Sequence, residues 1–200
     1  MTETEIKLRW NGTAQEARAL IERRAYGISV PRTLESDQIF DLPSAALRQS
    51  DQILRLRKTI SSDGTKRAMV TYKGPAMRDG YKSREEIEFD VSDPDTFTLV
   101  LDRLGYRPTF RYEKYRTQLR AAGEPGLITI DETPIGVYLE LEGPRDWIDS
   151  TAARLGLPAA QFLTVSYAGL YREYREEHPE APADMTFGLE GPYLPATKSP

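Results

Sequence analysis

The chain of 200 residues contains no cysteine and a single histidine, His178. Disulfide bonds and thiolate metal sites are therefore excluded. The histidine lies beside Pro179 in a polar stretch, so we expect neither a histidine-rich zinc site nor a Ser–His–Asp triad. No stretch approaches the roughly 20 apolar residues of a membrane span, and the charged N-terminus is unlike a signal peptide. We expect a cytoplasmic protein without a membrane partner.

An excess of charge of one sign is also missing. Twenty-seven lysines and arginines face thirty-one aspartates and glutamates, which gives a net charge of −4. Neither an overall basic excess, typical of nucleic-acid binding, nor a long acidic tail is present. With 29% charged and 39% hydrophobic residues, the composition is typical of a globular domain. The length suffices for one substantial core or two small ones.

Most of the chain alternates apolar and polar residues, which is the pattern of half-buried β-strands. The expected strands are 3–10, 37–42, 52–60, 66–74, 82–91, 109–120, 126–131 and 136–142. Apolar residues at helical spacing predict helices over 14–24, 94–104, 145–155 and 159–177. About eight strands joined mostly by hairpins predict one α+β domain dominated by an antiparallel sheet.

The C-terminal part is less regular in pattern. We expect one domain over residues 1–178, with the helices of 145–177 included. The remaining residues, 179–200, are rich in proline and predict an irregular tail. The expected helix 159–177 could close one end of a barrel or pair with a partner, but packing against the sheet is the simplest expectation. A homodimer is compatible with the sequence.

The polar positions of the strands carry mostly charged residues, and the charges segregate by strand. Basic residues are Arg55, Arg57, Lys73, Lys114 and Arg116; acidic residues are Glu3, Glu5, Glu140 and Glu142; Arg84, Glu86 and Glu88 mix both signs. A solvated sheet face would explain any one strand. The recurrence of arginine, whose planar fork suits phosphate oxygens, favours a binding surface instead. If the sheet closes with these residues inward, the cavity requires paired charges, ions or water.

The acidic residues predict a hard cation. Carboxylates without histidine or cysteine select Mg²⁺, Mn²⁺ or Ca²⁺. A divalent cation beside a basic cradle is the usual apparatus of phosphoryl chemistry. Gly64-Thr65-Lys66 lacks the upstream glycine and the residue order of a Walker P-loop. A phosphate site must therefore be built from side chains.

Taken together, these residues resemble the CYTH family of triphosphate tunnel metalloenzymes, over roughly residues 1–170. The family includes class IV adenylyl cyclases, thiamine triphosphatases and inorganic triphosphatases. Seven elements occur in the family's order: Glu3-x-Glu5-x-Lys7, Asp37-Gln38-Ile39-Phe40-Asp41, Leu54-Arg55-Leu56-Arg57, Tyr72-Lys73-Gly74, Arg84-x-Glu86-x-Glu88, Lys114-x-Arg116 and Glu140-x-Glu142.

The resemblance implies an eight-stranded, closed antiparallel β-barrel, with helices packed outside, that binds a triphosphate in its tunnel. The implied phosphate ligands are Lys7, Arg55, Arg57, Lys73, Arg84, Lys114 and Arg116. The implied ligands of Mg²⁺ or Mn²⁺ are Glu3, Glu5, Glu140 and Glu142, with Glu86, Glu88 and Asp131 as further candidates. Lys73 and Glu5 are the implied catalytic residues. For each charged residue the alternative is an internal salt bridge.

The resemblance leaves the reaction open. We favour hydrolysis of a triphosphate, because it requires fewer specific parts. The alternatives are cyclisation of ATP to cyclic AMP and pyrophosphate, and a sensor that binds nucleotide or polyphosphate without turnover. In thiamine triphosphatases a tyrosine at the position of Ile39 is thought to act with the lysine corresponding to Lys73, so thiamine triphosphate is disfavoured here. Nucleic acid is also disfavoured, because the aromatic residues mostly fall on the face opposite the arginines; they are Tyr72, Phe89, Phe110 and Tyr115.

Overall fold

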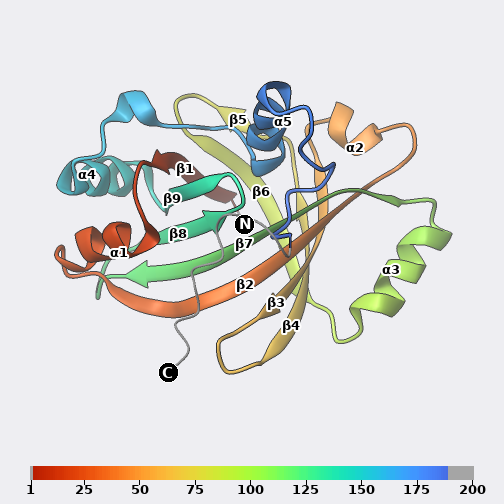
Figure 1. The fold of residues 1–200 in the computed structure, drawn as a ribbon, viewed down its shortest axis with the longest axis horizontal. Helices are drawn as coiled ribbons and strands as arrows, with labels where there is room; N and C mark the ends of the chain where they lie inside the picture. The colour runs from red at the N-terminus through yellow and green to blue at the C-terminus, as the bar shows by residue number, and fades with distance from the viewer. Residues whose placement is uncertain (1, 189–200) are drawn as a thin grey trace.

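The structure is a computed structural model that describes residues 2–188. Its strands form one antiparallel sheet in the order β1-β9-β8-β7-β2-β3-β4-β6-β5, and pairing of β1 with β6 closes eight strands into a barrel (Figure 1). The strands are β1 (Thr2–Trp10), β2 (Gly27–Asp41), β3 (Ile53–Ile60), β4 (Lys66–Lys73), β5 (Met77–Arg78), β6 (Lys82–Asp90), β7 (Arg107–Arg120), β8 (Leu127–Thr133) and β9 (Gly136–Glu142). The helices are α1 (Ala14–Glu22), α2 (Ala46–Gln49), α3 (Pro94–Arg103), α4 (Arg145–Leu155) and α5 (Tyr167–Glu177). The expected closed barrel with helices outside is confirmed.

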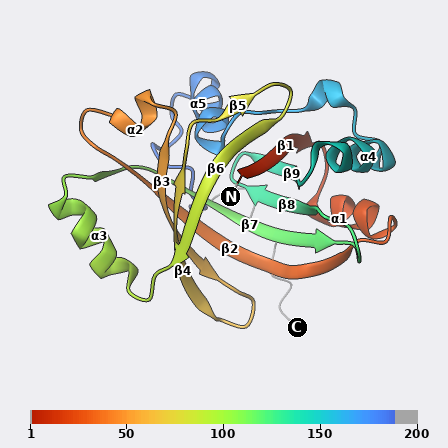
Figure 2. The same cartoon turned by 180° about the vertical axis from the view of Figure 1, so that it is seen from behind.

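The main hydrophobic core lies outside the barrel wall rather than inside it. Ile6, Leu8, Leu139 and Leu141 point outward from β1 and β9 and are at most 1% exposed. They belong to one cluster with buried residues of α1 and α4, among them Ile148. Figures 1 and 2 show both helices beside these strands. The other side of the same strands is therefore left for the charged residues.

Strand β2 is longer than expected, because it begins at Gly27 rather than at residue 37. Pro31 suggested a break, since proline has no N–H for a strand ladder. In the structure the strand passes through Pro31 where its pairing with β7 shifts register, between Val30 and Thr33. Pairing with β3 begins only at Leu34, so the proline lies where β2 has a single irregular neighbour.

The expected helix 159–177 is divided in the structure. A short 3₁₀ turn (Ala159–Gln161) comes first, and α5 begins only at Tyr167, where the hydroxyl of Ser166 accepts a bond from the N–H of Gly169. Between them, Leu163 exchanges two backbone hydrogen bonds with Lys7 of β1. This β-bridge breaks the helix. Helix α2 and strand β5 were not expected from the sequence.

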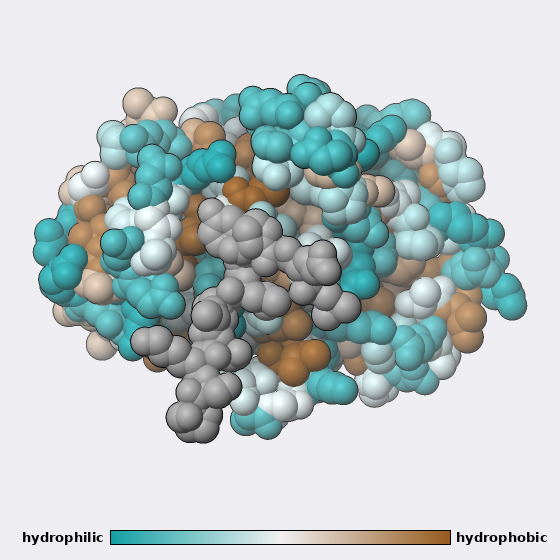
Figure 3. All heavy atoms as spheres, viewed as in Figure 1, coloured by the Kyte–Doolittle hydropathy of each residue, from teal (hydrophilic) through white to brown (hydrophobic). Residues whose placement is uncertain are grey.

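Part of the expected tail packs on the barrel, and residues 189–200 lie outside the described residues. Met185 is fully buried, and it exchanges backbone hydrogen bonds with Arg111 and Glu113 of β7. The helices and strands of residues 2–188 include no helix that is both long and apolar enough to cross a membrane. On the face in Figure 3, hydrophilic residues dominate, with small apolar areas between them.

Candidate polyanion and metal site inside the barrel

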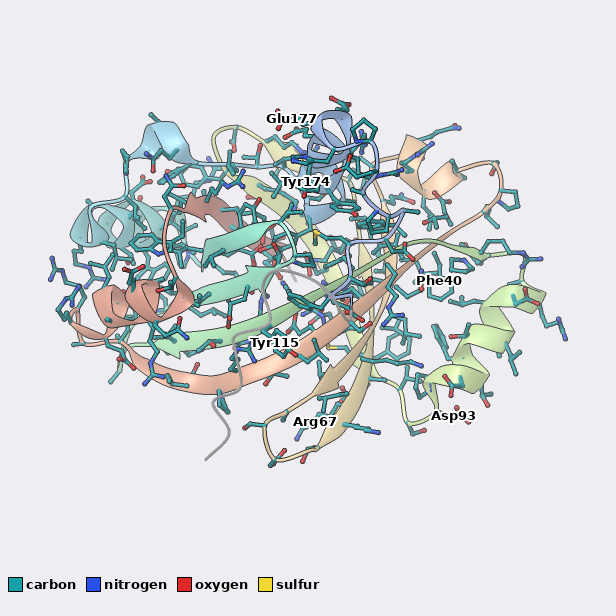
Figure 4. The ribbon with its side chains drawn as sticks, in the orientation of Figure 1. Phe40, Arg67, Asp93, Tyr115, Tyr174 and Glu177 are labelled. Carbon is teal, nitrogen blue, oxygen red and sulfur yellow. The ribbon has the colours of Figure 1, made fainter. Side chains whose placement is uncertain are left out.

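Charged side chains from all eight barrel strands converge in the interior. An unbroken series of ion pairs crosses the lumen in the order Lys7–Glu140–Arg116–Asp131–Lys114–Glu35–Arg57–Asp37–Arg55–Glu88. Apart from Glu88 at the rim and Arg116, these residues are less than 10% exposed. Strand alternation produces this arrangement, since residues two apart on a strand share a face. Tyr115, at an intervening position of β7, points outward (Figure 4) and packs under Arg32.

Arg57 is held by two acidic residues of β2. Its Nε and one terminal nitrogen donate to the two oxygens of Asp37 at 2.8 and 3.1 Å, and another nitrogen lies 2.9 Å from Glu35. The Nε of Arg55 lies 3.4 Å from Oδ1 of Asp37, the oxygen that also accepts from the Nε of Arg57. Burial opposes ionisation of Asp37, but the two guanidinium groups lower its pKa to about 2. Both arginines thus lie against one carboxylate with a lowered pKa, which holds them in the lumen.

Glu35 and Asp37 were not among the site residues expected from the sequence. The alternation of Glu35, Asp37 and Ile39 was the available signal. It was missed because Pro31 suggested that the strand starts only at residue 37, which left Glu35 in a connector.

Asp131 anchors the opposite side of the lumen. Lys114 donates to it at 2.8 Å, and Arg116 donates through two nitrogens at 2.7 and 2.6 Å. The hydroxyl of Tyr167, from α5, donates to the same carboxylate at 2.6 Å. Burial would raise the pKa of Asp131, but the two cations lower it. Asp131 is fully buried, and both of its oxygens are engaged by protein groups.

A cluster of carboxylates occupies the part of the lumen formed by β1, β6 and β9. Glu86 bonds to Lys73, and Glu5 accepts from Lys82 at 2.5 Å. Among residues 2–188, no basic group lies within 4.0 Å of the carboxylate of Glu3 or of Glu142. Lys82 was not expected as a site residue, and only its period-two spacing with Arg84 could have indicated it.

The protonation of this cluster reflects its excess of negative charge. Burial raises the pKa of Glu3 to about 8; Lys73 opposes the shift, and Glu142, Glu86 and Glu5 add to it. The pKa of Glu142 is also raised, mainly by burial. For Glu5, burial is outweighed by Lys82 and Lys7, which lower its pKa to about 2. Lys73 has a lowered pKa because of burial and the nearby Arg55.

The oxygen atoms of these carboxylates are suitable ligands for a divalent cation, but in this structure they are not arranged around a common centre. Glu3 and Glu142 offer oxygen donors, are largely buried and form no direct ion pair within residues 2–188, which suits Mg²⁺ or Mn²⁺. In the described part of the chain no three acidic groups already form a metal cage. Glu140 bonds to Lys7 and Arg116, so it would have to exchange a partner to bind a metal.

The two remaining expected residues lie at the margins of the lumen. Arg84 is buried, and it donates to the backbone carbonyls of Gly74 and Asp51 at 2.7 and 2.6 Å. It therefore joins two loops in this structure. Glu88 has a side chain 41% exposed, and it accepts a bond from Thr71 at 2.8 Å.

A closed barrel whose lumen is lined by ion pairs, with its hydrophobic core outside, defines a charged-tunnel protein. The model of one such family, the CYTH domain, matches residues 1–167, and the chain belongs to the CYTH domain family. The resemblance inferred from the seven sequence elements is confirmed.

Individual relatives agree with this assignment. "Putative adenylate cyclase MJ0240" of Methanocaldococcus jannaschii is 29% identical over 113 residues, which cover 56% of this chain and 61% of that protein, so the match spans less than two thirds of the relative. The PH1819 protein of Pyrococcus horikoshii is similar in structure, with a TM-score of 0.71 and 26% identity over 86% of this chain and 99% of that one. "Putative adenylyl cyclase HpAC1" of Hippeastrum, whose structure is described as revealing a dominant triphosphatase activity, shares the fold at a TM-score of 0.59 and 16% identity, over 86% and 96% of the two chains.

Proposed function

We propose that this protein is a divalent-metal-dependent enzyme that binds a triphosphate inside the barrel and hydrolyses it. The observation that carries the proposal is the buried series of arginines and lysines beside Glu3 and Glu142, two carboxylates that form no ion pair within 4.0 Å among residues 2–188. Members of the CYTH family are adenylyl cyclases and triphosphatases, and the names of the relatives include both activities.

The charge balance of the lumen supports joint binding of polyanion and metal. Eight basic residues line it or its margins: Lys7, Arg55, Arg57, Lys73, Lys82, Arg84, Lys114 and Arg116. Nine acidic residues face them: Glu3, Glu5, Glu35, Asp37, Glu86, Glu88, Asp131, Glu140 and Glu142. The protein groups alone nearly cancel, so a triphosphate would leave a large uncompensated negative charge in a buried space. Bound divalent cations would neutralise the negative charge of the triphosphate.

The basic residues would hold the phosphate chain. Arg55, Arg57, Lys114 and Arg116 would turn part of their donor capacity from carboxylates to phosphate oxygens. Asp37 and Asp131 would keep them in place during the exchange. Hydrogen-bond donors that are already in position need little reorganisation when charge shifts in the transition state. Mg²⁺ or Mn²⁺ held by Glu3, Glu5, Glu140 and Glu142 would neutralise phosphate oxygens as a Lewis acid.

Two residues would serve the chemical step. Glu5 stays ionised because its pKa is about 2, so it would accept a hydrogen bond from the attacking water and orient it. Lys73 is largely buried and has a lowered pKa, so it would stabilise the terminal phosphate and transfer a proton. Ile39 faces the lumen near the aromatic residues of β7 and cannot transfer a proton. A thiamine triphosphatase is therefore not favoured.

The alternative reaction is cyclisation of ATP. The name of the archaeal relative supports it, and the same cradle would serve both reactions. The two differ in which phosphorus meets the nucleophile, a water molecule or the 3′-hydroxyl of ATP.

A substrate panel tests the proposal. ATP, GTP, tripolyphosphate and thiamine triphosphate should be assayed with Mg²⁺ and with Mn²⁺, with the products resolved as diphosphate plus phosphate or as cyclic nucleotide plus pyrophosphate. We expect metal-dependent phosphate release that falls by about 100-fold or more in Glu5→Gln. Glu22→Gln is the matched control, because Glu22 is exposed on α1. Binding without any turnover would instead support a sensor.

A further inference from the structure

One end of the barrel lumen changes from charged to aromatic, and α5 packs against it. The inward positions at this end are occupied by Ile39, Phe110, Tyr112 and Tyr138, and they cluster with Tyr167 and Tyr171 of α5. The ring of Tyr167 lies 5.9 Å from that of Tyr112 and 5.6 Å from that of Tyr138. Tyr167 is only 6% exposed. Its side chain therefore enters the end of the tunnel and does not merely cover the wall.

Tyr167 also contacts the basic residues that would bind phosphate. The Nζ of Lys7 lies 4.2 Å from the centre of its ring, and that of Lys114 lies 4.9 Å away. Its hydroxyl donates to Asp131 at 2.6 Å. The ring thus occupies one side of both ammonium groups, held there by cation–π attraction and a charge-assisted hydrogen bond. A phosphate can reach these ammonium groups only from the other side, within the lumen.

The chain on both sides of Tyr167 is fastened to the barrel. Before it, Leu163 bridges to β1 through hydrogen bonds of 3.1 and 2.8 Å with Lys7. After it, the hydroxyl of Tyr171 donates to the carbonyl of Pro182 at 2.8 Å, and Met185 bridges to β7. The position of the ring is therefore fixed by attachments to two strands on different sides of the lumen.

We propose that Tyr167 forms the closed end of the phosphate site and thereby limits the length of the phosphate chain that the enzyme accepts. This inference rests on the proposed function and adds a specificity determinant to it. A chain whose terminal phosphate reaches Lys7 and Lys114 ends against the aromatic ring. A further phosphate meets a buried apolar surface without a donor for its oxygens, and burying such a charge is costly. A longer chain can bind only when its extra phosphate is displaced toward the opposite mouth, out of register with the basic residues that hold three phosphates.

Three variants separate the ring from its hydroxyl and from the helix. Tyr167→Ala removes the ring, whereas Tyr167→Phe keeps it and removes only the bond to Asp131. Tyr174→Ala is the matched control on the same helix (Figure 4), because Tyr174 stacks on Tyr171 and His178 without contact to the ion pairs of the lumen. The readout is the ratio of kcat/KM for linear tripolyphosphate to that for linear tetrapolyphosphate, with Mn²⁺ present.

We expect the wild type and Tyr174→Ala to prefer tripolyphosphate by about tenfold or more, and Tyr167→Phe to stay within about twofold of the wild type. Tyr167→Ala should lose most of that preference. An unchanged ratio in a folded Tyr167→Ala variant would overturn the proposal. So would wild-type enzyme that cleaves both chains equally, which decides the matter even if Tyr167→Ala does not fold. If the wild type cleaves tripolyphosphate and tetrapolyphosphate with a ratio near one, only this inference fails; if it cleaves neither of them nor ATP, the proposed function fails with it.

Discussion

Arg57 and Asp37 illustrate how single residues are prepared for a ligand in this barrel. The two side chains form a bidentate pair at 2.8 and 3.1 Å in a buried place. Removing one partner of such a pair leaves an uncompensated charge, which typically costs about 3 to 5 kcal/mol. Substituting Arg57 with alanine would therefore test stability more than binding. Arg57→Lys keeps the charge, loses the planar fork and is the better probe of phosphate recognition.

Glu3 gives the first prediction at this scale, which concerns pH. Its pKa is raised from 4.5 to about 8 by burial and by neighbouring carboxylates. The folded state therefore retains a proton that the unfolded state loses, so this group stabilises the fold fully below pH 4.5, and the contribution is lost as the pH rises through about 8. A cation requires the ionised form. Metal binding should thus release a proton and tighten as the pH rises toward 8.

The measurement is Mn²⁺ affinity by calorimetry between about pH 6 and about pH 9, in buffers of different ionisation enthalpy to count released protons. Glu3→Gln should bind the metal more weakly and with a flatter pH dependence. Affinity of the wild type that is independent of pH over this range would contradict the assignment of Glu3 to the metal site.

At the scale of elements, helix α4 packs closely against the barrel through a contact between a tryptophan and a glycine, which has no side chain. Trp147 of α4 lies over Gly126, which directly precedes β8, and a Cβ built on Gly126 would lie 2.3 Å from the indole ring. The residues there are buried, so the ring cannot move into solvent. Only glycine allows this approach, and α4 covers the outer faces of β1 and β9 as a result.

Gly126→Ala should therefore lower the free energy of unfolding by about 1 to 3 kcal/mol, because the added methyl group overpacks the site. Urea unfolding followed by Trp fluorescence measures the change. Gly27→Ala is the control, since a Cβ at Gly27 meets nothing within 4 Å, and it should change stability by less than about 0.5 kcal/mol. Equal stability of the two variants would show that α4 does not pack as described.

Most helices and strands could be predicted from the sequence, but the start of β2 and the helix predicted over 159–177 were wrong. Both errors concealed residues of the site. Pro31 suggested a break in β2, which concealed Glu35 as a lumen residue. The apolar spacing of 159–177 suggested one helix, because periodicity does not register the β-bridge of Leu163 with β1. The role of Tyr167 could not be predicted, since its partners Asp131, Lys7 and Lys114 are distant in sequence. Such contacts depend on tertiary structure.

At the scale of the whole molecule, the barrel reverses the usual distribution of polarity. Small barrels ordinarily fill their interior with apolar side chains, whereas this one places its apolar core between the outer wall and α1 and α4. The alternation of charge along the strands predicted most of the residues that share the lumen, but it did not lead us to Glu35, Asp37 or Lys82. Which cation pairs with which carboxylate was not predictable, because the register across non-adjacent strands is set by closure of the barrel.

The central claim is that one polyanion binds inside this lumen together with a divalent cation. Its most direct test is calorimetric titration of β,γ-imido-ATP, which resists hydrolysis, into the wild type and Arg57→Lys with and without Mn²⁺. Arg18→Gln on α1 is the control, since Arg18 is exposed and forms its ion pair with Glu22 on the same helix. We predict one bound nucleotide per chain, binding that requires Mn²⁺, and a loss of about tenfold or more in Arg57→Lys alone. Equal affinity in Arg57→Lys and the wild type, or no binding to either, would contradict the account.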